Sequence, residues 1–128
     1  MKISDSLLKK LPKVELHCHL DGCLRLETIL DLAQKQKVSL PSSNPGDLNK
    51  ILSIGKKRGT LEEYIARFDI TLSVMQTPDA LKRTAYELIA DAASENIRYI
   101  EVRYSPILHT TKGMTLEDAV ISVLDGLK

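Results

Sequence analysis

The feature that most constrains this chain is a short apolar segment that ends in two histidines and a turn, VELHCHLDG at residues 14–22. Alternate side chains of an extended strand share a face, so His17 and His19 project from the same side and can both reach one ion. Positions i and i+2 of a helix lie on different faces, so this spacing indicates a buried strand. We therefore predict a metal site at the end of the strand, with ordinary half-buried histidines as the simpler alternative.

The turn and the two cysteines beside the histidines add detail to this hypothesis. Asp21 and Gly22 end the strand in a tight loop, where the backbone can approach a ligand closely. Cys18 alternates to the opposite face of the strand, whereas Cys23 lies past the turn and stays open as a less favoured metal ligand. We expect both to be free thiols in a cytoplasmic protein, because the sequence shows no secretory segment.

The length and net charge of the chain limit the kinds of molecule that it can bind. The 128 residues are 43% hydrophobic, and 18 Lys and Arg against 17 Asp and Glu give a net charge of +1. This balance provides no strong field for nucleic acid or for an anionic membrane, and no long apolar run would cross a bilayer. We therefore expect a small-molecule partner. The chain has the size of one compact domain, yet it is too short to close a (β/α)8 barrel, which takes about 250 residues.

Hydrophobic periodicity and capping residues predict two strands separated by helices, the alternation that a β/α fold requires. The predicted helices cover residues 25–37, 47–53, 60–75, 78–95 and 116–127, and the second strand covers residues 97–105. Turn-forming residues between positions 40 and 60 indicate an insertion. Three adjacent basic residues within it, at positions 56–58, favour a solvated loop over an anion site.

The second predicted strand has an unusual charged face, because Tyr99, Glu101 and Arg103 alternate onto one side. A lone buried charge is costly, so we expect Glu101 and Arg103 to neutralise each other or Glu15. We interpret these residues as structural support around the site rather than as catalytic residues. His109 follows in a loop, where we expect it to be solvated.

Four segments of the chain together resemble the N-terminal part of the adenosine deaminase family. They are KVELHCHLDG at residues 13–22, ETIL at 27–30, FD at 68–69 and EVRYSP at 101–106, in the family's order and roughly at its spacing. The resemblance implies an α/β fold that is the N-terminal part of a (β/α)8 TIM barrel, with two barrel strands and several helices. Residues 1–128 would then be an N-terminal fragment of a single metal-dependent deaminase barrel domain.

The resemblance also implies roles for residues of this chain. His17 and His19 would bind Zn²⁺, while Asp21 and Gly22 would contact a purine nucleoside, with Asp21 accepting a ribose hydroxyl. The positions that match the family's apolar gate over the purine are Leu61, Tyr64 and Ile65. The implied reaction is the hydrolytic removal of the 6-amino group of adenosine by a zinc-activated water, which gives inosine and ammonia.

The family's remaining metal ligands and its catalytic acid belong to strands beyond Lys128. The resemblance therefore implies no catalytic residue within this chain, and we expect the chain alone to be inactive. Two alternatives stay open. One is another metallohydrolase that begins with an H-x-H strand and acts on a different amino-purine or on a phosphate ester. The other is a non-catalytic module that associates with itself through an open sheet edge.

Overall fold

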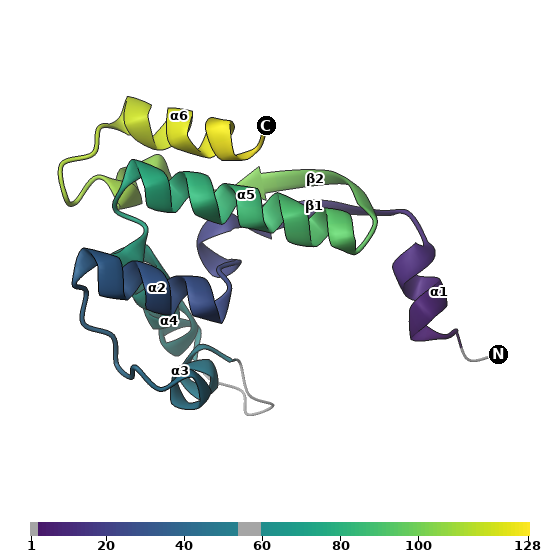
Figure 1. Ribbon diagram of the computed structural model, residues 1–128, viewed down its shortest axis with the longest axis horizontal. Helices are drawn as coiled ribbons and strands as arrows, with labels where there is room; N and C mark the ends of the chain where they lie inside the picture. Colours follow the sequence, from purple (N-terminus) through teal and green to yellow (C-terminus); the bar gives the residue numbers. More distant parts are fainter. Residues whose placement is uncertain (1–2, 54–59) are drawn as a thin grey trace.

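The computed structural model describes residues 3–53 and 60–128, without the side chain of Glu63 (Figure 1). The basic triplet at positions 56–58 lies outside the described residues. In chain order the elements are α1 (Asp5–Lys10), β1 (Lys13–His19), the 3-10 turn η1 (Leu20–Gly22), α2 (Leu26–Gln36), α3 (Pro45–Leu52), α4 (Leu61–Val74), α5 (Pro78–Ser94), β2 (Ile97–Arg103), the 3-10 turn η2 (Pro106–His109) and α6 (Leu116–Gly126). None of the described helices is long and apolar enough to cross a membrane.

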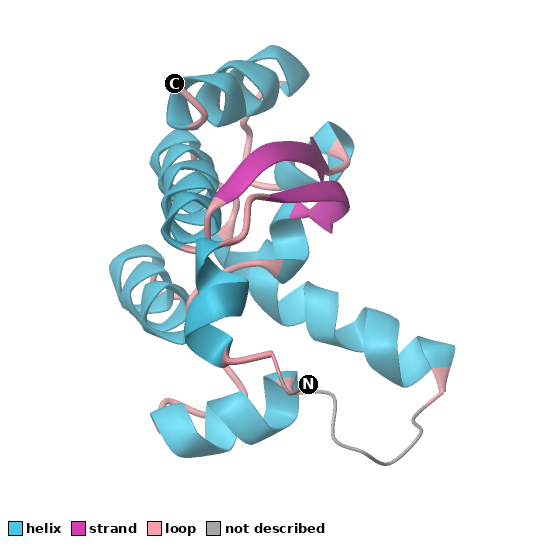
Figure 2. Ribbon diagram, turned by 90° about the vertical axis from the view of Figure 1, so that its right-hand side faces the viewer, coloured by secondary structure: helices cyan, strands magenta, loops and turns pink. Residues whose placement is uncertain are grey.

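The two strands are parallel neighbours, with Lys13 paired to Ile97 at one end and His19 to Arg103 at the other. Figure 2 shows them side by side among the helices. Parallel neighbours need a crossover connection, which here runs through α2, α3, α4 and α5. This topology confirms the expected α/β class with two parallel strands, the arrangement expected for the N-terminal part of a (β/α)8 barrel. The residues that follow the strands collect at their shared C-terminal edge, where such barrels carry their sites.

The core forms where α5 runs along the sheet and α6 packs on α5 (Figure 1). Leu20, Leu81 and Ala85 are completely buried there. Gly126 allows α6 to come close, because a Cβ at this position would lie 2.3 Å from the carbonyl oxygen of Lys82. The end of α6 therefore docks on α5 through backbone, with no room for a side chain.

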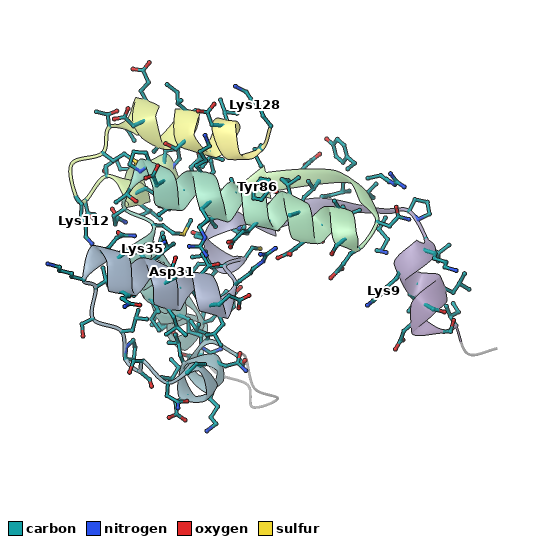
Figure 3. The ribbon with its side chains drawn as sticks, viewed as in Figure 1. Lys9, Asp31, Lys35, Tyr86, Lys112 and Lys128 are labelled. Carbon is teal, nitrogen blue, oxygen red and sulfur yellow. The ribbon has the colours of Figure 1, made fainter. Side chains whose placement is uncertain are left out.

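Charged side chains join α2 to α5. The Nε atom of Arg25 donates to Oδ2 of Asp91 at 3.0 Å, and Arg83 of α5 bonds to Asp31 of α2. Figure 3 labels Asp31 beside Lys35, whose Nζ lies 2.8 Å from the same carboxylate. These donors lower the pKa values of Asp31 and Asp91. The pairs hold α2, and with it the segment that follows β1, against α5.

The prediction of a buried first strand is wrong for the described residues. Val14 and Leu16 of β1 are 63% and 56% exposed, and Glu15 and His17 are exposed as well. A parallel strand is buried only when helices cover both faces of the sheet and a neighbouring strand lies at each edge. Among the described residues, β2 is the one strand that pairs with β1. The apolar residues of β1 are therefore left open to solvent.

Candidate functional site

The first strand ends in the two histidines that the sequence singles out. The side chains of His17 and His19 lie on the same side of β1, with their Nε2 atoms 3.0 Å apart and their ring centroids 5.0 Å apart. His19 is also the strand residue that pairs with Arg103 of β2. The two rings thus converge at the C-terminal edge of the sheet.

The spacing of the two rings can be compared with that of zinc ligands. Two imidazoles on one tetrahedral Zn²⁺, with bonds of about 2.0–2.1 Å, place their donor atoms about 3.3 Å apart. The observed 3.0 Å between the Nε2 atoms of His17 and His19 is close to this value. Within the described part of the chain, no group of three or more His, Cys, Asp or Glu residues could hold a metal ion. The histidines therefore fit two ligands of a zinc ion, and their role stays a prediction.

Hydrogen bonds from both strands support the segment that carries the histidines. The backbone N–H of His17 donates to Oε1 of Glu15 at 3.1 Å. Nη2 of Arg103 donates to the carbonyl oxygen of Leu16 at 3.2 Å and lies 3.4 Å from Oε2 of Glu101. The predicted pairing of Glu101 with Arg103 is confirmed, and Arg103 additionally joins β2 to β1 next to His17.

The turn η1 places Asp21 in the protein interior, where it is only 7% exposed. Its Oδ1 lies 3.9 Å from Nδ1 of His19, and it accepts no hydrogen bond from the described residues. At the next position, a Cβ on Gly22 would lie 3.3 Å from the ring of Phe68, so η1 and α4 approach closely here. A buried acceptor without a donor is costly, so Asp21 is suited to receive a hydrogen bond from a ligand.

A cavity of about 170 Å³, partly open to solvent, lies between η1 and the helices α2, α3 and α4. Its lining combines apolar side chains with a few polar groups, as small-molecule sites do. The lining residues are Asp21, Gly22, Leu24, Ile29, Leu52, Tyr64, Arg67, Phe68 and Thr71. His17 and His19 are not in this lining. Asp21 therefore stands between the histidines and the cavity.

The predicted gate residues are only partly brought to this cavity. Tyr64 lines it, and its ring meets that of Phe68 edge-on with the centroids 5.4 Å apart. Leu61 and Ile65 are 67% and 54% exposed and are not in the lining. The structure thus brings Tyr64 together with Asp21 and leaves the other two on the surface of α4.

Sequence reasoning missed Arg67 and Thr71, which line the cavity from the same helix. A signal for them is present, because Tyr64, Arg67, Phe68 and Thr71 occupy positions i, i+3, i+4 and i+7 of α4. These positions form one face of a helix. Helical periodicity read from Tyr64 therefore indicates both residues.

The expectation that His109 is solvated is wrong, because its side chain is completely buried. Pro106 opens η2, and this turn folds the loop back into the protein. Nδ1 of His109 lies 3.0 Å from the carbonyl oxygen of Met75, and since a carbonyl only accepts, Nδ1 carries the proton. Burial lowers the pKa of His109, opposed by this hydrogen bond and by the charge of Asp21.

The two cysteines face each other at the end of the strand. Both are free thiols, and their Sγ atoms are 3.3 Å apart. Burial, together with the neighbouring Cys18, raises the pKa of Cys23 to about 12. Cys23 therefore contacts Cys18, which makes it a poorer candidate metal ligand than the exposed histidines.

Comparison with known proteins gives consistent matches. A family model described as adenosine deaminase matches residues 12–128. An adenosine deaminase of Clostridium botulinum (strain 657 / Type Ba4) is 52% identical over 120 residues, which are 94% of this chain and 36% of the relative. The chain therefore spans about a third of the length of the curated relatives it matches.

Several solved structures share this fold. The adenine deaminase from Arthrobacter aurescens is similar with a TM-score of 0.79 and 27% identity, covering 91% of this chain and 34% of that one. An amidohydrolase from Burkholderia ambifaria with bound zinc is similar with a TM-score of 0.77 and 28% identity, covering 98% and 34%.

Proposed function

Because this chain belongs to the adenosine deaminase family, we propose that it is the N-terminal part of a zinc-dependent enzyme that converts adenosine and water to inosine and ammonia. The observation that carries the proposal is the pair of Nε2 atoms of His17 and His19, 3.0 Å apart at the C-terminal edge of the sheet. Bound zinc in the similar amidohydrolase supports the choice of metal. We propose that the other metal ligands and the catalytic acid lie outside these 128 residues.

Some residues of this chain would hold the metal, and others would bind the nucleoside. When bound, zinc would activate a water molecule for attack on the purine. His17 and His19 would hold it through Nε2, and Asp21 would accept a hydrogen bond from a ribose hydroxyl. Gly22 would contact the nucleoside where η1 and α4 approach closely, and Tyr64 lines the same cavity.

Leu61 and Ile65 would contact the purine in the same complex. Both are apolar, and both lie exposed in the first two turns of α4. A flat aromatic base that covered them would remove apolar surface from water, which favours binding. We propose these two residues, with Tyr64, as the apolar gate.

The test uses the complete protein that carries this sequence, loaded with zinc and supplied with adenosine. We expect His17→Ala and His19→Ala each to release the zinc and to lower kcat by at least about a hundredfold, since even outer-shell partners of a metal cost ten- to a hundredfold. Cys18→Ser, between the two histidines, is the matched control and should keep both zinc and activity. Histidine variants that keep their zinc and turnover would refute the proposal.

The choice of substrate distinguishes adenosine deaminase activity from adenine deamination and from phosphate-ester hydrolysis. Turnover of adenine without turnover of adenosine would assign the protein to the activity of the similar adenine deaminase. Hydrolysis of a phosphate ester, without release of ammonia from any purine, would instead support the metallohydrolase alternative.

A further inference from the structure

Two residues that line the same cavity each carry a buried polar atom without a partner, and the two atoms are of opposite kind. Nη1 of Arg67 is a donor and Oδ1 of Asp21 is an acceptor, and neither has a hydrogen-bond partner among the described residues. Both residues line the cavity between η1 and α4. A direct hydrogen bond between them would satisfy both atoms, and that bond is not formed. A ligand group in the cavity that satisfied both atoms would remove the cost of leaving them unpaired.

The chemistry of the two atoms restricts what that group can be. A guanidinium N–H only donates and a carboxylate oxygen only accepts, so one bridging group must accept from Arg67 and donate to Asp21. A hydroxyl does both. A phosphate would accept from Arg67 but would be repelled by Asp21, and an ammonium group would be repelled by Arg67. Water also qualifies chemically, and the experiment below separates it from a substrate hydroxyl.

We propose that Arg67 is a substrate-binding residue that holds one ribose hydroxyl of the nucleoside between its guanidinium and the carboxylate of Asp21. This inference rests on the proposed function and adds a sugar contact from α4. Arg67 lies one helical turn after Tyr64 and directly before Phe68, whose rings form the apolar wall beside it. Hydrogen bonds to charged groups are stronger than neutral ones, so this contact would contribute substantially to nucleoside binding.

The experiment measures kcat and KM of the complete zinc-loaded protein for adenosine and for its 2′-, 3′- and 5′-deoxy analogues. We expect Arg67→Met to lower kcat/KM roughly ten- to a hundredfold for adenosine and for two of the analogues, mainly by raising KM. For the third analogue, which lacks the bridging hydroxyl, Arg67→Met should lower kcat/KM almost no further. Asp21→Asn should likewise lower kcat/KM for the other substrates and leave that of the same analogue almost unchanged. Arg67→Lys should recover part of the loss that Arg67→Met causes.

Controls keep the outcome interpretable. Arg98→Met makes the same change at an exposed position near the start of β2 and should leave all four substrates unaffected. Circular dichroism and zinc content establish that each variant is folded and loaded. An equal loss on all four substrates, or no loss on any, would overturn the inference and leave an ordered water as the bridging group. A wild-type protein that deaminates none of the four would refute the proposed function as well.

Discussion

The thiol of Cys23 is held in its protonated form. Burial and the sulfur of Cys18 at 3.3 Å raise its pKa to about 12, so at neutral pH almost none of it is the thiolate that reacts. We expect iodoacetamide at pH 8 to alkylate Cys23 on the order of a thousandfold more slowly in the folded than in the urea-unfolded protein. Site-resolved mass spectrometry measures both rates. Equal rates would show that the thiol is not buried.

His109 should make folding sensitive to mild acid. Burial lowers its pKa below the ordinary value of 6.5, so between these two values the unfolded chain binds a proton that the folded one does not. The stability that neutral His109 contributes is therefore complete above pH 6.5 and is lost as the pH falls through the lowered pKa. Urea unfolding of wild type and of His109→Asn at pH 7.5 and pH 5.5 measures this effect. We expect the wild type to lose more stability than the variant, which keeps a donor for Met75, and an equal loss would contradict the assignment.

Predictions for single residues succeed where a repeat along the strand or helix determines which side chains share a face. Alternation along a strand is enough to bring His17 and His19 together. The burial of His109 depends on how η2 folds back against Met75, and no local pattern specifies that contact. Arg67 lies between these two cases. The helical period places it on the same face as Tyr64, but only the packed structure shows that its guanidinium nitrogen has no partner among the described residues.

The contact of α6 with α5 depends on the missing side chain of Gly126. A Cβ there would lie 2.3 Å from the carbonyl oxygen of Lys82 and 2.7 Å from Cβ of Ala85, so backbone would have to move. We expect Gly126→Ala to destabilise the protein by about 1–3 kcal/mol, the usual cost of overpacking. Chemical denaturation of the two proteins measures the difference.

Gly46 provides the matched control for this substitution. It lies in the first turn of α3, and a Cβ there would meet only the side-chain oxygen of Asn44, at 3.2 Å. Alanine also has the higher helix propensity, so Gly46→Ala should be close to neutral. If both alanine variants were equally stable, the close packing of α6 on α5 would be refuted.

At the level of elements, capping residues located helix starts well. Thr77 and Pro78 begin α5 and Thr115 caps α6, as the sequence indicates. The predicted start of α3 is two residues late, although Asn44 as cap and Pro45 at the first position are ordinary start signals. The exposure of β1 could not be predicted from its own residues, because burial of a strand depends on which neighbours cover it.

The structure has consequences for the isolated 128-residue chain. Its described residues place two imidazoles together and contain no complete group of metal ligands. We expect this chain, purified and supplied with zinc, to convert no measurable adenosine to inosine in an assay that detects the complete protein readily. Turnover at an ordinary enzymatic rate would show that the missing ligands are not required.

The isolated chain should also associate with itself. Val14 and Leu16 are exposed on β1, and β2 is its one neighbouring strand among the described residues, so an edge is open to further pairing. We expect the apparent mass in analytical ultracentrifugation to rise above 14.3 kDa with concentration.

Substitutions can assign this association to the strand edge. Leu16→Lys should shift it to higher concentration, because a charged edge strand resists pairing. Tyr86→Lys is the matched control, since Tyr86 is just as exposed but lies on α5 (Figure 3). If both variants weakened association equally, general surface hydrophobicity would explain it. If only Leu16→Lys weakened association, the open edge of β1 would be identified as the site of pairing. In a closed barrel a neighbouring strand covers such an edge.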